Sequence, residues 1–249
     1  MKPVKRLLLG CLFGAIAGAA TASPVLVSEA PWGADTDVGI MDNVFGAGNW
    51  TFYNNYGAAN PASVFTSGNH FVWLEGGDGT EPTWQAYINA NAGTILNWVD
   101  AGGALLMMSA GWNSLTTTLG AGTLTHTGYY DCATLTAAGQ AALPGTPAGQ
   151  CGIFVAHDTV SGTGLTVFMT NDTNGQPVLS GTAEGAGYVM YSGLTDYQFN
   201  YAGTSLLENV VAYTNGQGGT IPEPATLSLL GLGLAGLAGG RRRQKRQAA

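Results

Sequence analysis

Continuous apolar runs and helically spaced apolar residues alternate along the first half of the chain. Four short apolar runs, separated by polar and Gly-rich segments, are typical of buried strands. These runs are residues 24–29, 50–53, 70–75 and 104–109. Apolar residues at helical spacing predict helices over residues 36–45 and 83–101, the second with a break expected near residues 91–93.

Gly102 and Gly103 follow the longer helix and end it immediately before the next apolar run. The order strand, helix, Gly-Gly, strand predicts a βαβ unit with parallel strands and a right-handed crossover. Residues 23–216 are long enough for one well-packed domain. The expected fold class is therefore α/β, with a mostly parallel sheet flanked by helices, followed by a short linker over residues 217–221.

The second half of the chain has a weaker pattern. Residues 111–152 are rich in Gly, Thr and Ala with little periodicity, so a long excursion from the sheet is expected there. Strand patterns return in three segments, and a final helix is predicted over residues 205–214. The three predicted strand segments are residues 159–170, 177–179 and 188–193.

The N-terminal residues have the pattern of a secretory signal peptide. Lys2, Lys5 and Arg6 precede an apolar stretch over residues 7–19, and Ala20-Thr21-Ala22 provides small residues at a cleavage site. We expect residues 1–22 to be removed and the mature chain to start at Ser23. A retained N-terminal anchor is the alternative.

The C-terminal segment, residues 222–249, has three parts in a fixed order. Pro222, Glu223 and Pro224 form a short extended peptide, because proline fixes φ and cannot donate a backbone hydrogen bond. Residues 225–240 carry no charge and would form a transmembrane helix of about 24 Å, short for a ~30 Å hydrocarbon core. The basic residues that follow, beginning with Arg241, Arg242 and Arg243, should stay cytoplasmic.

This three-part tail resembles the PEP-CTERM sorting signal of Gram-negative bacteria. The resemblance implies recognition by an exosortase, anchoring of a precursor in the inner membrane, and processing near Pro222–Pro224. Delivery to the cell surface or to an exopolysaccharide matrix would follow. A plain C-terminal membrane anchor is the alternative, although such an anchor does not require Pro-Glu-Pro.

Charge is divided sharply between the chain ends and the region between them. All eight Lys and Arg lie within the two terminal segments, and all fifteen Asp and Glu lie between residues 23 and 240. That middle region therefore has a formal charge of −15 with His neutral. Nucleic-acid binding is excluded as a function, because no side chain there can displace the counterions of phosphates. A cationic partner or a divalent metal is electrostatically allowed.

Two cysteines remain after removal of the signal peptide. An even number of cysteines in an oxidising exterior favours a disulfide between Cys132 and Cys151. Closing a loop of this length would stabilise the fold by about 3 kcal/mol. A two-cysteine metal site is the alternative, but the spacing of nearby histidines fits no zinc pattern. No metal or other cofactor is expected.

The outer domain also resembles the class I glutamine-amidotransferase-like superfold, including ThuA-like proteins. The segments that carry this resemblance are residues 71–77, 98–106, 187–193 and 206–209. The resemblance implies a parallel sheet with any site at the carboxyl ends of its strands. Amidotransferases place a nucleophilic cysteine on a turn after a central strand, whereas this chain has Met108-Ser109-Ala110-Gly111. Glutamine hydrolysis through a Cys-His-Glu triad is therefore not expected.

Polar residues at the predicted strand ends supply the candidate chemistry. Ser109, His157 and Glu75 could act as nucleophile, base and orienting acid. The alternative is that Ser109 is a turn residue, His157 a loop residue and Glu75 a capping residue. The segment around Ser109 lacks a complete nucleophile elbow, which favours this alternative. His70 and His126 are expected to be surface or structural residues. An enzyme is thus not the favoured interpretation.

Two further candidate sites depend on acidic and aromatic residues. Asp35 with Asp37, and Asp78 with Glu81, could supply oxygen ligands to calcium, or could be solvated turn carboxylates. Six tryptophans could line a sugar-binding face, but Trp73, Trp84 and Trp98 are expected in the core. Trp32, Trp50 and Trp112 lie near loops and remain open to ligand.

The sequence therefore favours an exported, exosortase-processed protein of the cell surface or of an exopolysaccharide matrix, with a non-catalytic interaction domain. The alternatives are a secreted hydrolase that uses Ser109, His157 and Glu75, and a calcium-dependent adhesion module. The expected partners are the exosortase, the membrane through the C-terminal helix, and exopolysaccharide.

Overall fold

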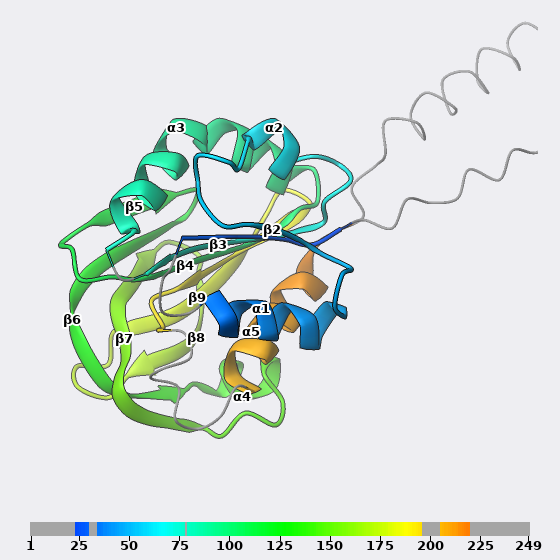
Figure 1. Cartoon of the computed structure of the whole chain (residues 1–249). Helices are drawn as coiled ribbons and strands as arrows, with labels where there is room; N and C mark the ends of the chain where they lie inside the picture. The colour runs from blue at the N-terminus through cyan, green and yellow to red at the C-terminus, as the bar shows by residue number, and fades with distance from the viewer. Residues whose placement is uncertain (1–22, 30–33, 78, 196–204, 220–249) are drawn as a thin grey trace, which may run out of the picture.

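A ten-stranded sheet lies between two layers of helices (Figure 1). The computed structural model describes residues 23–29, 34–77, 79–195 and 205–219 of the 249-residue chain. Along the sheet the strand order is β2-β1-β3-β4-β10-β9-β8-β6-β5, and β7 pairs with β6 outside this path. The α/β class expected from the sequence is confirmed.

One half of the sheet is parallel and contains most of the predicted strands. It comprises β2 (Thr51–Tyr53), β1 (Val25–Ser28), β3 (Phe71–Gly77), β4 (Ala104–Ala110) and β10 (Gly187–Ser192). Except for the edge strand β2, every residue of these strands is buried. Burial on both faces explains why four of them appear in the sequence as continuous apolar runs.

The other half of the sheet is antiparallel, so the expectation of a mostly parallel sheet was wrong. It comprises β9 (Pro177–Glu184), β8 (Thr166–Asn171), β6 (Gly122–Leu135), β5 (Thr116–Leu119) and β7 (Gly149–Gly162). β5, β6 and the first residues of β7 occupy residues 111–152, where the sequence predicted an excursion from the sheet. The sheet is therefore mixed rather than mostly parallel.

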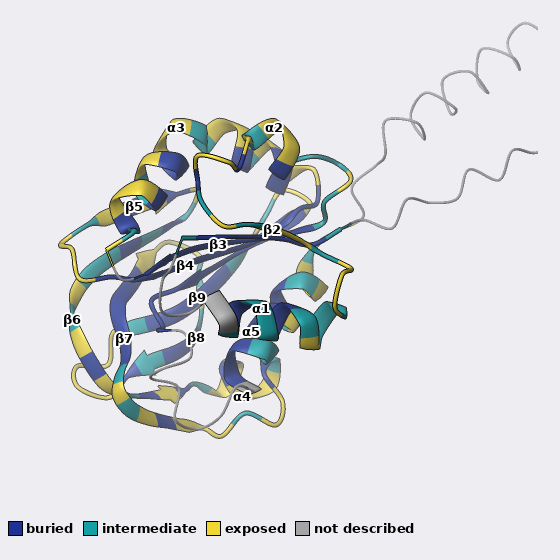
Figure 2. Ribbon diagram, in the orientation of Figure 1, coloured by how far each residue is buried: buried dark blue, intermediate teal, exposed yellow. Residues whose placement is uncertain are grey.

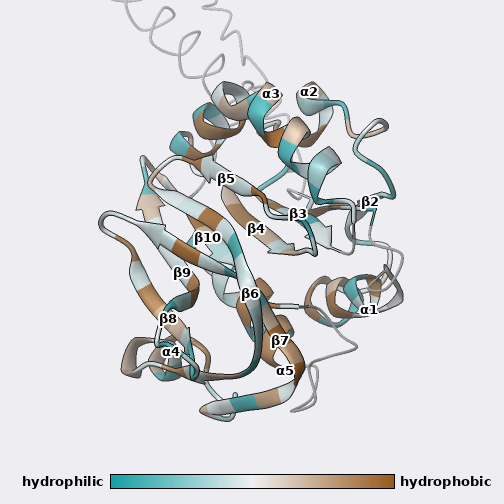
Figure 3. Ribbon diagram, turned by 90° about the vertical axis from the view of Figure 1, so that its left-hand side faces the viewer, coloured by the Kyte–Doolittle hydropathy of each residue, from teal (hydrophilic) through white to brown (hydrophobic). Residues whose placement is uncertain are grey.

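Turn glycines and half-buried strands account for this difference. The chain reverses between β5 and β6 at two residues, Gly120 and Ala121, and Gly120 has a φ of 56° that favours glycine. β6 has one polar, solvent-facing side, so it is mostly white and teal in Figure 3, in contrast to the brown of β4. A 14-residue strand of this composition lacks the apolar run that identifies β4 in the sequence.

Helices cover both faces of the sheet. α1 (Ala34–Phe45) and α5 (Ser205–Gln217) pack together on one face, and α2 (Pro61–Val64) and α3 (Glu81–Asp100) lie on the other (Figure 1). The short α4 (Ala137–Ala142) packs against β8. α3 is a continuous helix without the expected break, and the predicted helices over α1 and α5 are confirmed.

Each face of the sheet has its own hydrophobic core. Trp73 and Met108 belong to the core on the α1 and α5 side, whereas Leu74 and Met107 belong to the core on the α3 side. Figure 2 shows the central strands β3 and β4 dark blue, with exposed yellow residues on the outer sides of α3 and β6. The three tryptophans predicted to be internal are buried; they are Trp73, Trp84 and Trp98.

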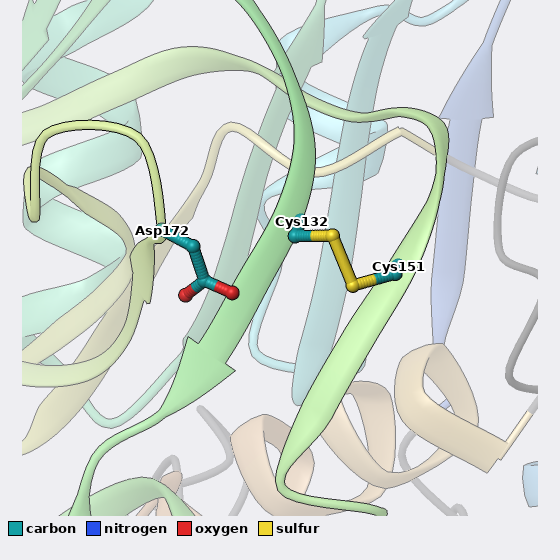
Figure 4. Close-up of side chains that lie close together, drawn as sticks. All are labelled: Cys132, Cys151 and Asp172. Carbon is teal, nitrogen blue, oxygen red and sulfur yellow. A yellow bond between two sulfur atoms is a disulfide. The ribbon is translucent and has the colours of Figure 1, made fainter.

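A disulfide joins Cys132 of β6 to Cys151 of β7, as the sequence predicted. The two residues are direct cross-strand partners with a Cα–Cα distance of 4.2 Å. Asp172 lies beside them, so two sulfurs and a carboxylate come close together (Figure 4). Because each sulfur is bonded to the other, this group is a disulfide with a neighbouring acid and not a metal site.

The predicted targeting segments, residues 1–22 and 222–249, lie outside the described residues. Within the described ranges, no helix has both the length and the hydropathy required to cross a bilayer.

Candidate functional site

The structure brings Ser109 together with an acid that the sequence did not indicate. Ser109 is near the carboxyl end of β4 and is only 3% exposed. Its side chain lies near the carboxyl group of Asp158 on β7 and lowers the pKa of that group. This pairing joins the parallel half of the sheet to the antiparallel half at the strand ends.

Glu75 does not join this pair. Glu75 of β3 is directly opposite Met108 of β4, so its side chain points to the α1 and α5 face. Ser109 is the next residue after Met108 and therefore points to the α3 face. Instead, Glu75 Oε2 accepts a hydrogen bond of 2.8 Å from Ser28 Oγ. The set Ser109, His157 and Glu75 is thus divided between the two faces of the sheet.

His157 lies at the same strand ends as Ser109, and its hydrogen bonds there join neighbouring segments of the backbone. Its Nδ1 is 3.1 Å from the carbonyl oxygen of Gly111, and its backbone N–H donates to Gly193 O at 2.9 Å. Because a carbonyl oxygen can only accept, Nδ1 must carry the proton in this contact. These two bonds hold His157 between the residues that follow β4 and β10.

Asp158 is buried in a group of titratable side chains. Burial raises the pKa of Asp158 to about 7, the side chain of Ser109 opposes this rise, and the nearby Glu81 carboxylate adds to it. His126 Nδ1 of β6 lies 3.3 Å from Asp158 Oδ1. Asp158 therefore titrates near neutral pH next to one of the few side chains in this domain that can become cationic.

Glu81 connects the first turn of α3 to the segment after β4. Its Oε1 accepts from Trp112 N at 2.6 Å and its Oε2 accepts from Asn113 Nδ2 at 2.7 Å. A Cβ at Gly111 would overlap the Glu81 carboxylate, so a larger residue there would displace the carboxylate from Trp112 N and Asn113 Nδ2. Glu81 thereby fixes the position of Trp112.

Three aromatic side chains form a partly exposed surface above His157, and we refer to Trp112, Tyr129 and Phe154 as the aromatic cluster. The ring centroid of Trp112 lies 4.9 Å from that of Tyr129 and 5.4 Å from that of Phe154. All three rings lie within 5.6 Å of the imidazole of His157. Trp112 and Tyr129 are each 46% exposed, although each is large and apolar.

Local backbone irregularities present these rings. The pairing of β6 with β7 shifts register between His126 and Tyr130, and such a bulge re-aims the side chains within it. Phe154 has a φ of 61°, a left-handed conformation that costs a bulky residue about 1–2 kcal/mol. Among the described residues, Phe154 is the only one other than glycine with a positive φ. Strain and irregular pairing therefore coincide at the aromatic cluster.

Several other predicted site residues lie elsewhere or outside the described chain. His70 and Trp50 line a cavity of about 580 Å³ at the opposite edge of the sheet, with Phe45 and Asn49. Asp37 is buried on α1, where its Oδ2 lies 3.4 Å from Ser28 Oγ. The candidate residues outside the described chain are Trp32, Asp78, Pro222, Glu223, Pro224, Arg241, Arg242 and Arg243.

Sequence reasoning missed most of the residues around Ser109. Asp158 was not considered, and His126 was expected to be a surface or structural residue. Tyr129 lay within residues 111–152, where an excursion was expected, and Phe154 lay between that segment and the next predicted strand. Trp112 was the exception, because it was predicted to remain open. One sequence signal could have indicated Asp158. It directly follows His157 and precedes an alternating apolar pattern, so the sequence places an acid and a histidine together at the start of a predicted strand.

The C-terminal segment matches a known sorting motif. Residues 220–243 match the family model described as the PEP-CTERM protein-sorting motif. This match includes Pro222, Glu223 and Pro224, as well as Arg241 to Arg243. It indicates an exported precursor that is processed by an exosortase. No curated protein matches the chain in sequence.

Solved structures of several kinds are similar to the outer domain. A cytoplasmic protein from Salmonella typhimurium has 11% identity and a TM-score of 0.47 over 77% of this chain and 98% of its own. A glutamine amidotransferase from Thermotoga maritima has 14% identity and a TM-score of 0.43 over 78% and 84%. A β-galactosidase from Bacillus circulans has 13% identity and a TM-score of 0.46 over 78% of this chain. The chain spans only 31% of that β-galactosidase, and none of these similarities assigns an activity.

Proposed function

We propose that this protein is exported, processed by an exosortase, and located at the cell surface or in an exopolysaccharide matrix, where its outer domain binds polysaccharide without catalysis. The observation that carries the binding role is the aromatic cluster. Exposed aromatic rings can stack on the apolar faces of sugar rings, and their polar edges remain available for hydrogen bonds. Such a surface binds an extended chain without enclosing it.

The arrangement beneath the rings supports a rigid binding surface. Glu81 fixes the backbone of Trp112, and His157 packs under all three rings. A ligand therefore meets side chains that are already held in place, which lowers the entropic cost of binding. The catalytic alternative receives less support, because Glu75 lies on the opposite face of the sheet from Ser109.

Binding of purified exopolysaccharide to the full-length protein in detergent would test this role. We expect wild-type protein to bind and Trp112→Ala to lose at least about tenfold in affinity. Phe52→Ala is the matched control, since Phe52 is 39% exposed on the edge strand β2, far along the sheet. Equal binding by wild type and Trp112→Ala would contradict a role for the aromatic cluster.

Localisation requires a separate test. Replacing Pro222, Glu223 and Pro224 with alanine should leave export intact but block processing, so that the protein accumulates as a membrane-bound precursor. Cell fractionation and the mass of the surface form would measure this. A normal surface form in this variant would contradict exosortase processing at the motif.

The hydrolase alternative keeps one specific observation in its favour. Ser109 lies near Asp158, whose pKa of about 7 would allow proton exchange near neutral pH. If the protein hydrolyses a polysaccharide or an acyl ester and Ser109→Ala abolishes that activity, the non-catalytic proposal fails. The calcium alternative has less support, because both oxygens of Glu81 already accept hydrogen bonds.

A further inference from the structure

We propose that the aromatic cluster recognises an amino-sugar polymer, that is, a glycan with unacetylated and therefore positively charged amino groups. This inference rests on the proposed polysaccharide-binding function and names the class of sugar. The partly exposed rings of Trp112 and Tyr129 and the exposed carboxylate of Asp131 beside them carry the inference.

The rings provide the first part of the recognition. The face of an aromatic ring attracts a cation located within about 6 Å of its centroid, and tryptophan is the strongest of the aromatic residues in this respect. Trp112 and Tyr129 lie 4.9 Å apart with an interplanar angle of 44°, so the two rings are inclined to each other rather than stacked flat. An ammonium group on a sugar could approach both rings while the sugar itself packs against Phe154.

Asp131 provides the second part. Its Oδ1 accepts a hydrogen bond of 3.2 Å from the backbone N–H of Phe154, which fixes the carboxylate next to the aromatic cluster. Asp131 and Tyr129 of β6 are both exposed, whereas Tyr130 between them is buried, so both side chains lie on the outer side of the strand. The carboxylate is therefore available as a counter-charge to a bound ammonium.

The negative charge of the whole domain favours binding of cationic glycans over anionic ones. The region between residues 23 and 240 has fifteen acidic residues and no Lys or Arg. A polysaccharide with carboxylate or sulfate groups would be repelled, and no fixed cation near the aromatic cluster could compensate. A polymer with protonated amines would instead be attracted at long range and at the rings.

The test compares three hexasaccharides with the full-length protein in detergent, at a pH at which glucosamine amines are protonated. The probes are a hexamer of glucosamine, its fully N-acetylated form, and a hexamer of galacturonate. Quenching of tryptophan fluorescence measures the affinity. We expect the glucosamine hexamer to bind about tenfold more tightly than the acetylated hexamer, and the galacturonate hexamer not to bind.

Two pairs of variants locate the recognition. Trp112→Ala should weaken binding of the glucosamine hexamer by at least about tenfold, with Phe52→Ala as the matched control. Asp131→Asn should reduce the preference for the charged hexamer by about threefold to tenfold, because the amide still accepts from Phe154 N–H but carries no charge. Asp172→Asn is the matched charge control, since Asp172 is an exposed acid beside the disulfide.

The outcomes separate this inference from the proposed function. If both hexamers bind equally and Trp112→Ala weakens both, polysaccharide binding stands and the preference for amino sugars is wrong. If binding of the glucosamine hexamer is unaffected by Trp112→Ala, or Asp172→Asn weakens it as much as Asp131→Asn does, the attraction is non-specific and the inference fails. If hexalysine binds as tightly as the glucosamine hexamer and loses as much affinity in Trp112→Ala, the ligand of the aromatic cluster is a cationic peptide and the proposal of an amino sugar is wrong.

Discussion

Buried Asp158 makes the stability of this domain depend on pH in an unusual direction. Its pKa is raised to about 7 in the folded protein, mainly by burial, so folding favours the protonated form. The stabilisation is complete below the ordinary aspartate pKa of about 4 and is lost as the pH rises through about 7. The groups around the carboxyl are Ser109, His126 and Glu81.

Asp158→Asn should therefore remove part of this pH dependence. We expect the variant to be more stable than wild type by about 1–3 kcal/mol at pH 8 and nearly equal to it at pH 4. Thermal unfolding at the two pH values measures the difference. Asp172→Asn, an exposed acid, is the control and should behave as wild type does. A variant that is less stable at pH 8 would show that ionised Asp158 is held by partners such as His126.

Gly111 has a steric role that can be tested separately. Gly111→Ala should destabilise the protein by about 2–4 kcal/mol, because the added methyl group overlaps the carboxylate of Glu81. Gly93→Ala is the matched control, since nothing lies within 4 Å of its Cβ position inside α3, and helix propensity predicts a small gain. Urea unfolding measures both variants. Equal stability of the two would contradict the close packing at Gly111.

At the scale of secondary structure, the parallel half of the sheet could be predicted and the antiparallel half could not. β1, β3, β4 and β10 are buried on both faces, so their composition alone identifies them. β6 is buried on one side only and is interrupted by register shifts, which removes a clear period of two. The one short-range signal that was overlooked is the Leu119-Gly120-Ala121-Gly122 reversal between two Thr-rich segments.

The same limit explains the outcome for the candidate site. Ser109 and His157 were recognised because they lie at the ends of predicted strands, whereas Asp158, His126 and Tyr129 reach the site through β6 and β7. Pairing between distant strands decides which residues meet, and no local pattern specifies it. The side to which Glu75 points could have been predicted from alternation only if the register of β3 and β4 had been known.

The disulfide joins β6 and β7, the two long strands that hold Tyr129 and Phe154 of the aromatic cluster. Replacing both Cys132 and Cys151 by serine should lower the free energy of unfolding by about 3 kcal/mol, because the unfolded chain regains the freedom of the open loop. Denaturant titration measures this loss. Unchanged stability would mean that β6 and β7 are held by their other contacts. We also expect weaker ligand binding in this variant, since Tyr129 and Phe154 lie on the joined strands.

At the scale of the whole molecule, the separation of charge gives a direct test of processing. Trypsin cleaves only after Lys and Arg, and none occurs between residues 7 and 240. Even in urea, digestion should therefore leave one large fragment that ends at Arg241 or at an earlier processing point. Mass spectrometry of this fragment should give Ser23 as its first residue. A fragment that begins at Leu7 would contradict removal of the signal peptide.

Both ends of the described domain lie at the amino edge of the parallel strands. Ser23 N–H donates to Gly68 O, and Gly219 lies against Gly102 and Ala186. The aromatic cluster lies at the carboxyl edge, about 23 Å away along a seven-residue strand. While the tail tethers the precursor, its ligand-binding face would therefore point outward from the lipid, and neighbouring tethered copies could hold one polymer at several points. Release of the tail would abolish this avidity without altering any single binding site.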